Sequence, residues 1–187
     1  MRQFIHAVAA AVTLTACAPS PGSFHGSPGG LTLDVKESLF LGNGGAQENP
    51  NMLFLLMTDR PGLCDAIRSG NTLEDMTYFR VHPVVTSYHG QYFQPRPGNY
   101  PVIPNLAISL AYAHASLERT DSACQTAEIV EGTGGTITLD GYEPKPGGRM
   151  TGSFAVTFGT DAEPGTGDFD ALYCDAFDSW SLTPGCQ

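Results

Sequence analysis

The chain of 187 residues has the length of a single domain once its ends are set aside, and 41% of its residues are hydrophobic. Charged residues make up only 15%, and the 22 Gly and 14 Pro favour short strands joined by turns over long solvent-facing helices. The net charge of −10 argues against nucleic acid and against a polybasic grip on anionic lipid, because both polyanions repel an acidic protein.

Residues 1–16 predict a signal peptide. Arg2 supplies a positive charge, an apolar stretch follows over residues 4–12, and small residues precede Cys17. The whole apolar run of about 13 residues is shorter than the roughly 20 that a membrane-spanning helix needs. A permanent transmembrane anchor is therefore not expected.

Residues 14–17, LTAC, resemble the lipobox of bacterial lipoproteins, in which Leu and two small residues precede a Cys. The resemblance implies that a diacylglyceryl group is attached to Cys17, that the chain is cut after Ala16, and that acyl chains such as palmitate then anchor it to membrane lipid. Ala18 stands where such proteins carry an inner-membrane retention signal, usually Asp, which implies the outer membrane of a Gram-negative envelope. The alternative is an ordinary signal peptide cut near a chance Cys.

Residues 18–30, APSPGSFHGSPGG, predict a flexible tether, since Gly, Pro and Ser without any charge bury too little apolar surface to fold. The lipidated Cys and this tether form the segment 17–30, and the folded domain is expected over residues 31–187.

The first half of this domain predicts several strands and one helix. Apolar residues alternate over 31–35, which is typical of a half-buried strand, while the apolar run 52–57 predicts a strand buried on both faces. Asp59 is a candidate N-cap for a short helix near residues 61–69 that ends at Gly70. Three further strands are expected, with a helix left open for the last of them: 78–85, 87–93 and 106–112.

The C-terminal third predicts an antiparallel meander, because three alternating segments are separated by Gly- and Pro-containing turns. These segments are 135–142, 150–158 and 168–174. Strands that recur through the whole domain favour an all-β fold, either an antiparallel β-sandwich or an open barrel, with the one short helix.

Setting Cys17 aside leaves an even set of four cysteines, Cys64, Cys124, Cys174 and Cys186. In an oxidising compartment they predict two disulfides, and their long, unequal spacings are unlike those of a zinc site. Three connectivities are possible. The short loop between them favours Cys174–Cys186, which leaves Cys64–Cys124.

Four strings together resemble a group of uncharacterised bacterial lipoproteins with a β-rich domain: DRPGLC at 59–64, GTITL at 135–139, GRMTGSFAVTFG at 148–159 and GDFDALYC at 167–174. The resemblance implies a β-rich envelope domain and no known activity.

No catalytic or cofactor motif occurs in the chain. The strings His-Glu-x-x-His and Gly-x-Ser-x-Gly, the P-loop and the dinucleotide fingerprint are all missing, so we expect neither an enzyme nor a cofactor. The expected role is a non-catalytic binding or structural domain. A carbohydrate hydrolase that uses dispersed carboxylates is the alternative. The domain has three histidines, His82, His89 and His114, and for the pair His82 and His89 we expect solvated or hydrogen-bonded structural roles rather than metal binding.

Two groups of residues are candidate sites. The acidic stretch 161–170 offers four carboxylates to calcium, as in an adhesion module, although it also suits a solvated hairpin tip: Asp161, Glu163, Asp168 and Asp170. A second stretch interleaves aromatic rings with Gln94, Arg96 and Asn99, as a carbohydrate- or peptide-binding face does. Its rings, which are also ordinary strand residues, are Tyr88, Tyr92, Phe93 and Tyr100. The protein or glycan ligand is left open.

Overall fold

The computed structural model describes residues 20–42, 52–71, 73–86, 91–104 and 111–176. The signal peptide, Cys17, Tyr88, His89 and Cys186 lie outside these ranges, as does most of the strand expected over 106–112. The elements in chain order are β1 (Gly22–His25), η1 (Pro28–Gly30), β2 (Glu37–Gly42), β3 (Leu53–Thr58), α1 (Leu63–Arg68), β4 (Thr77–Thr86), β5 (Tyr92–Phe93), β6 (Gly98–Pro101), β7 (Ala111–Thr120), β8 (Thr126–Tyr142), β9 (Arg149–Phe158) and β10 (Glu163–Cys174).

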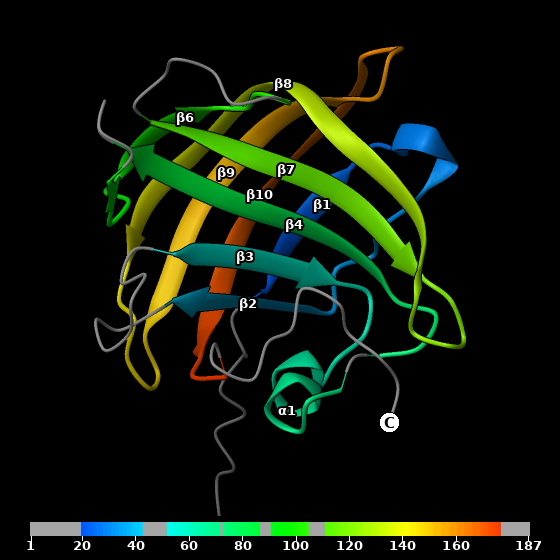
Figure 1. Ribbon diagram of the computed structural model, residues 1–187, viewed down its shortest axis with the longest axis horizontal. Coiled ribbons are helices and arrows are strands. Elements are labelled where there is room, and N and C mark those ends of the chain that lie inside the picture. Colours follow the sequence, from blue (N-terminus) through cyan, green and yellow to red (C-terminus); the bar gives the residue numbers. More distant parts are fainter. Residues whose placement is uncertain (1–19, 43–51, 72, 87–90, 105–110, 177–187) are drawn as a thin grey trace, which may run out of the picture.

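Seven strands close into one barrel, in the order β2-β3-β4-β7-β8-β9-β10, with β10 returning to β2 (Figure 1). Each strand is antiparallel to its neighbour along the chain. In such a ring an odd number of strands leaves one parallel pair, and the closing pair β10–β2 is parallel. The all-β class and the C-terminal meander are confirmed, but the closed barrel replaces the predicted sandwich or open barrel. Closure removes the edges that an open sheet would expose.

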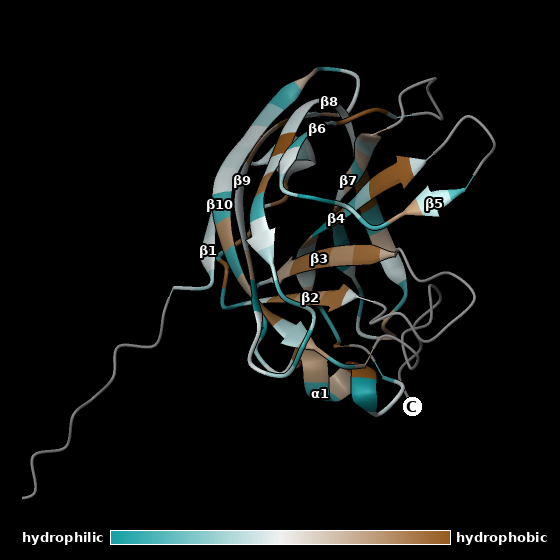
Figure 2. Ribbon diagram, turned by 90° about the vertical axis from the view of Figure 1, so that its left-hand side faces the viewer, coloured by the Kyte–Doolittle hydropathy of each residue, from teal (hydrophilic) through white to brown (hydrophobic). Residues whose placement is uncertain are grey.

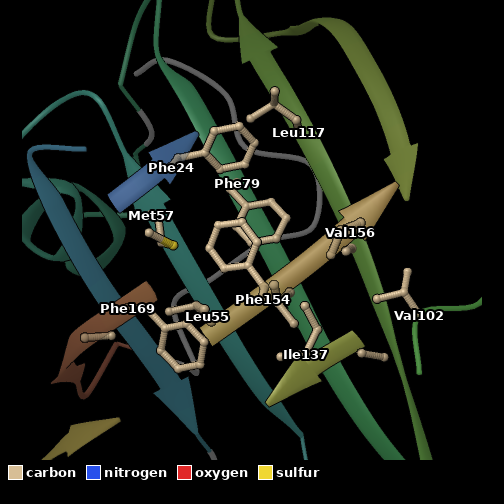
Figure 3. Close-up of a cluster of buried hydrophobic side chains, with 14 of the residues drawn as sticks. Phe24, Leu55, Met57, Phe79, Val102, Leu117, Ile137, Phe154, Val156 and Phe169 are labelled. Carbon is tan, nitrogen blue, oxygen red and sulfur yellow. The ribbon is translucent and has the colours of Figure 1, made fainter. Parts of the chain in front are cut away.

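The barrel interior is a packed aromatic and aliphatic core (Figure 3). The rings of Phe79 on β4 and Phe154 on β9 lie 4.6 Å apart between centroids, so opposite walls of the barrel meet at its centre. Phe24 of β1 packs against both, at 5.5 Å from each. Side chains therefore fill the middle of the barrel, as expected for a barrel of this size.

The predicted tether over residues 18–30 is wrong from Gly22 onward. Residues 22–25 form β1, which pairs antiparallel with β10 from Phe169 to Thr166, and Phe24 is buried in the core. Gly and Pro suggested a solvated linker, but the small residues around Phe24 let this strand lie closely against β10. A Cβ on Gly22 would stand 2.3 Å from the Asp168 carbonyl oxygen.

β2 and β3 are buried on both faces, and Figure 2 shows β3 as a mostly hydrophobic strand. Their inner side chains join the barrel core, and their outer side chains contact Leu63 and Ile67 of α1. The continuous apolar run at 52–57 is thereby confirmed as a doubly buried strand.

The expected helix is confirmed as α1, but Asp59 does not cap it. The N-cap is Gly62, in a left-handed conformation, and the Glu37 carboxylate accepts a hydrogen bond from the Leu63 amide at 2.8 Å. The Asp59 carboxylate instead accepts from the Thr77 amide of β4 at 2.9 Å.

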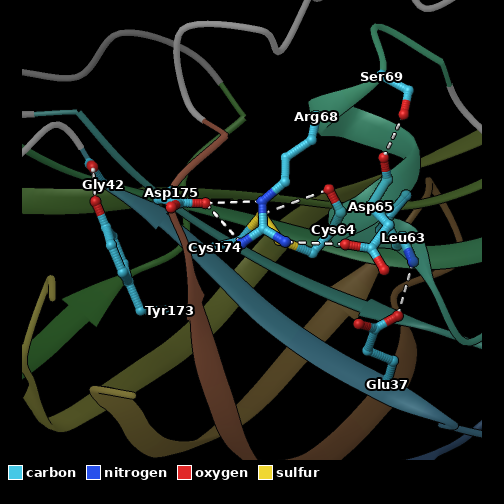
Figure 4. The surroundings of a disulfide bond; sticks show 10 residues. All are labelled: Glu37, Gly42, Leu63, Cys64, Asp65, Arg68, Ser69, Tyr173, Cys174 and Asp175. Atoms are coloured by element: carbon cyan, nitrogen blue, oxygen red, sulfur yellow. Dashed lines mark hydrogen bonds and ion pairs between the residues drawn. A yellow bond between two sulfur atoms is a disulfide. The ribbon is translucent and has the colours of Figure 1, made fainter. Parts of the chain in front are cut away.

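Among the described residues one disulfide forms, not two, and it joins Cys64 of α1 to Cys174 at the end of β10 (Figure 4). The predicted pairings Cys174–Cys186 and Cys64–Cys124 are therefore wrong. Loop length favoured the nearest cysteine, whereas α1 packs on the outer face of the barrel beside the end of β10. Cys124 is buried, and its partner is not among the described residues. Arg68 adds a second link between these elements through the Asp175 carboxylate at 2.7 Å.

Several boundaries also differ from the prediction. β8 starts at Thr126 rather than at residue 135. Residues 31–35 are not a strand, although Leu31 and Leu33 do alternate into the core, and the strand begins at Glu37. β10 starts at Glu163 rather than at residue 168.

Candidate functional site

A pocket of about 790 Å³ opens at the end of the barrel where β5, β6 and the end of β8 meet. In both Figure 1 and Figure 2, β6 lies near the top of the molecule and α1 at the bottom. Four of the residues that line the pocket also pack against the barrel core, so its floor is the end of that core: Val85, Tyr100, Ala111 and Tyr142. The mouth of a barrel is a common place for a small-ligand site, and the volume is in the usual range.

One wall of the pocket is residues 94–97, which we call the QPRP loop. Two tyrosine hydroxyls hold its backbone. Tyr142 donates to the Pro95 carbonyl at 2.8 Å, and Tyr100 donates to the Arg96 carbonyl at 2.6 Å. The Arg96 amide donates back to the Tyr100 oxygen at 2.8 Å, and the two prolines fix their own φ angles. The wall is therefore formed before any ligand arrives.

Burial raises the pKa of both clamping tyrosines above the ordinary value. Their hydroxyls consequently stay protonated and remain donors throughout the physiological range. The Tyr142 hydroxyl also forms a hydrogen bond with the side chain of Gln94, which lowers the Tyr142 pKa by less than burial raises it. This bond attaches the Gln94 side chain to the same hydroxyl that holds the backbone of the QPRP loop.

The described residues of the lining combine rings, amides and a single charge. Three aromatic side chains line it, with the amides of Gln94 and Asn99 and the guanidinium of Arg96: Phe93, Tyr100 and Tyr142. The Thr138 hydroxyl donates to the Asn99 Oδ1 at 3.0 Å, which orients the amide and leaves its NH₂ group as the donor. None of the described residues in the lining is an Asp, Glu, His, Ser or Cys.

The structure brings part of the predicted aromatic face into this pocket. Phe93 and Tyr100 line it, Tyr92 stands beside Phe93 on β5 and is half exposed, and Tyr88 lies outside the described residues. Sequence reasoning missed Tyr142 and Ala111. No local pattern could mark them, because the pairing of β7 with β4 and of β8 with β6 places them there.

The four acidic residues proposed for calcium are not brought together. Glu163 and Asp170 are seven positions apart on β10, about 23 Å along a strand. Glu163 accepts from the Gly29 amide at 2.5 Å, Asp168 accepts from the Ser23 hydroxyl, and Asp170 pairs with Arg149. These partners, rather than a shared cation, relieve the repulsion between Asp168 and Asp170. Within the described ranges no cluster of three potential metal ligands is found.

His82 of β4 lies opposite His114 of β7, with 6.4 Å between ring centroids, and it stacks on Phe54 at 4.3 Å. Burial, then the charge of His114 and that of Arg80, lower the His82 pKa to about 4. The ring is thus stacked and desolvated, whereas the sequence suggested a solvated or hydrogen-bonded histidine.

A buried polar cluster on the outer face of β4 and β7 was not anticipated. Its centre is Glu118, which forms an ion pair with Arg80 at 2.8 Å and accepts from the Tyr78 and Ser116 hydroxyls at 2.5 and 2.6 Å. Tyr78 and Glu118 are cross-strand partners 40 positions apart, so only the register of the barrel reveals the cluster. Burial and the nearby Glu118 charge raise the Tyr78 pKa. Both carboxylate oxygens of Glu118 have a hydrogen-bond or ion-pair partner, as is usual for a buried side chain with a structural role.

A comparison with protein-family models, curated proteins and solved structures finds no match to this chain. Across the part of the chain that the structure describes, no helix has the length and apolar character needed to cross a membrane.

Proposed function

We propose that this chain is a lipid-anchored protein of the bacterial cell envelope, in the outer membrane of a Gram-negative cell, whose barrel is a non-catalytic binding domain. The anchor is proposed from the lipobox at residues 14–17, with acylated Cys17 as the contact with membrane lipid. The binding role is proposed from the pocket at the barrel mouth, which is the single observation that carries it.

The chemistry of the pocket supports binding better than hydrolysis. Its rings and amides are groups that stack on a ligand and donate hydrogen bonds to it. A glycoside hydrolase places two carboxylates on either side of the bond that it cuts, and the lining residues that the structure describes supply none. The hydrolase alternative therefore has no observation in its favour. The carboxylates of β10 are dispersed along the strand and have other partners, so no observation favours the calcium alternative either.

Two measurements test the two parts of the proposal separately. For the anchor, cells that express the chain are labelled with radioactive palmitate, and we expect label in the membrane-bound protein that Cys17→Ser abolishes. Cys64→Ser is the matched control, because it also replaces one cysteine by serine but should retain the label. A Cys17→Ser variant that stays labelled and in the membrane fraction would overturn the anchor.

For the binding role, thermal unfolding of the full chain is measured with named probes: glucose, glucuronate, N-acetylglucosamine and tri-alanine at millimolar concentrations. A ligand that binds only the folded chain raises the unfolding temperature. Asn99→Trp, which fills the pocket from an exposed position, should remove the shift. The binding role fails if no probe shifts the transition.

We further propose that the remaining cysteines, Cys124 and Cys186, form a second disulfide. Peptide mapping of the non-reduced protein would detect the linked fragments, and two free thiols in the same digest would refute the pairing.

A further inference from the structure

We infer that the pocket at the barrel mouth takes an acidic sugar residue, with its carboxylate on Arg96, its ring against the aromatic side chains and its hydroxyls on Gln94 and Asn99. This inference rests on the proposed binding role and gives it a ligand class.

The charge of the pocket favours an anionic ligand. The chain has 19 acidic and 9 basic residues, yet among the described residues that line the pocket the only charged side chain is that of Arg96. Most of the other basic residues in the described ranges have a carboxylate partner: Lys36, Arg68, Arg80, Arg119, Lys145 and Arg149. Within those ranges no ion pair is formed by Arg96. Within the described part of this acidic protein, Arg96 is thus a cation at the pocket without a carboxylate partner, and such a cation attracts an anionic group.

The position of the Arg96 side chain is fixed by its backbone. The backbone amide and carbonyl of Arg96 are both bonded to the Tyr100 hydroxyl, and Pro95 and Pro97 flank the residue. The guanidinium therefore extends from a fixed point on the rim of the pocket. Its planar fork matches the two oxygens of a carboxylate, so the contact can be bidentate.

The other groups of the pocket suit the ring and the hydroxyls of a sugar. A sugar presents a face of C–H groups that stacks on aromatic rings, and Phe93, Tyr100 and Tyr142 provide such rings around the pocket. The NH₂ group of Asn99 is directed by Thr138, and the Gln94 amide is held by Tyr142. Both amides lie beside the rings, where the hydroxyls of a stacked sugar would be. A volume of about 790 Å³ suits one or two sugar rings rather than a long chain buried at full length.

The test compares glucuronate with glucose, because the two sugars differ only in a carboxylate in place of a hydroxymethyl group. Each is titrated into the isotopically labelled full chain, and chemical shifts of the QPRP loop report the dissociation constant. We expect glucuronate to bind about tenfold more tightly than glucose, the usual effect of a hydrogen bond to a charged group. We expect added salt to reduce that difference, because the contact is near solvent.

Arg96→Gln should abolish the preference for glucuronate over glucose, because glutamine carries no charge to pair with the carboxylate. Arg60→Gln is the matched control: Arg60 contacts the Asp75 carbonyl near α1, far from the pocket lining, and its loss should preserve the preference.

Equal binding of glucuronate and glucose would overturn the ligand class but leave the binding role standing. Tri-glycine, a peptide carboxylate, is titrated in parallel, and binding as tight as that of glucuronate would overturn the sugar in favour of a peptide. Failure of all three probes to shift any resonance of the loop would overturn the inference, and would also remove the support that the pocket gives to the binding role. Palmitate labelling of Cys17 would be unaffected by any of these results.

Discussion

Phe169 of β10 lies directly opposite Gly152 of β9, and its ring occupies the space that a side chain on Gly152 would need. A Cβ added to Gly152 would stand 2.4 Å from the Phe169 Cζ. Phe154 lies opposite Gly167 in the same way, at 2.7 Å from an added Cβ. In each pair a ring on one strand covers a glycine on the other, which pins the register of the two strands.

Gly152→Ala should therefore destabilise the fold by about 2–3 kcal/mol, because the methyl group overpacks the core. It would also approach the Thr138 carbonyl oxygen at 2.1 Å. Chemical denaturation measures the change. Gly141→Ala in β8 is the control, since an added Cβ there meets nothing within 4 Å and should change the free energy of unfolding little. Equal effects of the two variants would contradict the ring-over-glycine packing.

Phe24→Ala should cost about 3–5 kcal/mol, the usual effect of removing a buried ring. Its neighbour His25 is exposed, so His25→Ala is a matched control that should leave stability nearly unchanged. A chain that starts at Leu31 lacks β1 altogether, and we expect it to unfold at lower temperature than one that starts at Ser20. Equal melting temperatures for these two chains would show that β1 is dispensable.

Replacing Cys64 and Cys174 together by Ser should reduce stability by about 2–4 kcal/mol, because the disulfide closes a long loop in the unfolded chain. The two residues are 110 positions apart in the sequence. We expect hydrogen exchange to increase more in α1, which the bond attaches to β10, than in the barrel strands, whose protection should fall only by the change in global stability. An equal increase in α1 and in the barrel strands would show that the bond does not hold α1 locally.

Acid should destabilise the protein through His82, and the direction follows from its pKa. The unfolded-state value is near 6.5, and the folded-state value is about 4. Above pH 6.5 both states are neutral and stability is full. As pH falls from 6.5 towards 4, the unfolded state takes up a proton that the folded state does not, so stability decreases, by about 2 kcal/mol at pH 5.

Denaturation midpoints at several pH values measure this effect. His82→Gln should flatten the loss of stability between pH 6.5 and 4, whereas His25→Gln, at an exposed position, should retain it. A pH profile that His82→Gln leaves unchanged would assign the acid sensitivity to other groups.

The elements that the sequence predicted well are those whose pattern arises from burial alone. β3 is an unbroken apolar run because both of its faces are covered, and β9 alternates because one face is covered. Phe24 could not be placed in this way. It is one aromatic residue in a polar segment, and its partner strand lies more than a hundred residues further along the chain. Residues 31–35 show the converse error, since they alternate into the core without joining a ladder.

The candidate site also has one part that the sequence could predict and one part that it could not. Phe93, Gln94, Arg96, Asn99 and Tyr100 are close in sequence, so their mixture of rings and polar groups could be noticed there. The other side of the pocket depends on how the barrel closes, which no short string of residues encodes. The disulfide is similar: loop entropy ranks the possible pairs, but the docking of α1 on the outer wall selects Cys64–Cys174.

The position of β1 has a mechanical consequence for an anchored protein. Only five peptide units separate Cys17 from Gly22, a reach of at most about 18 Å, so a lipid on Cys17 would hold the barrel close to the bilayer surface. No slack linker would absorb a pull on that lipid. The load would pass into the four residue pairs between β1 and β10, and through Phe24 into the centre of the barrel. A force on the lipid anchor would then pull on β1, the strand whose Phe24 also contributes to the stability of the fold.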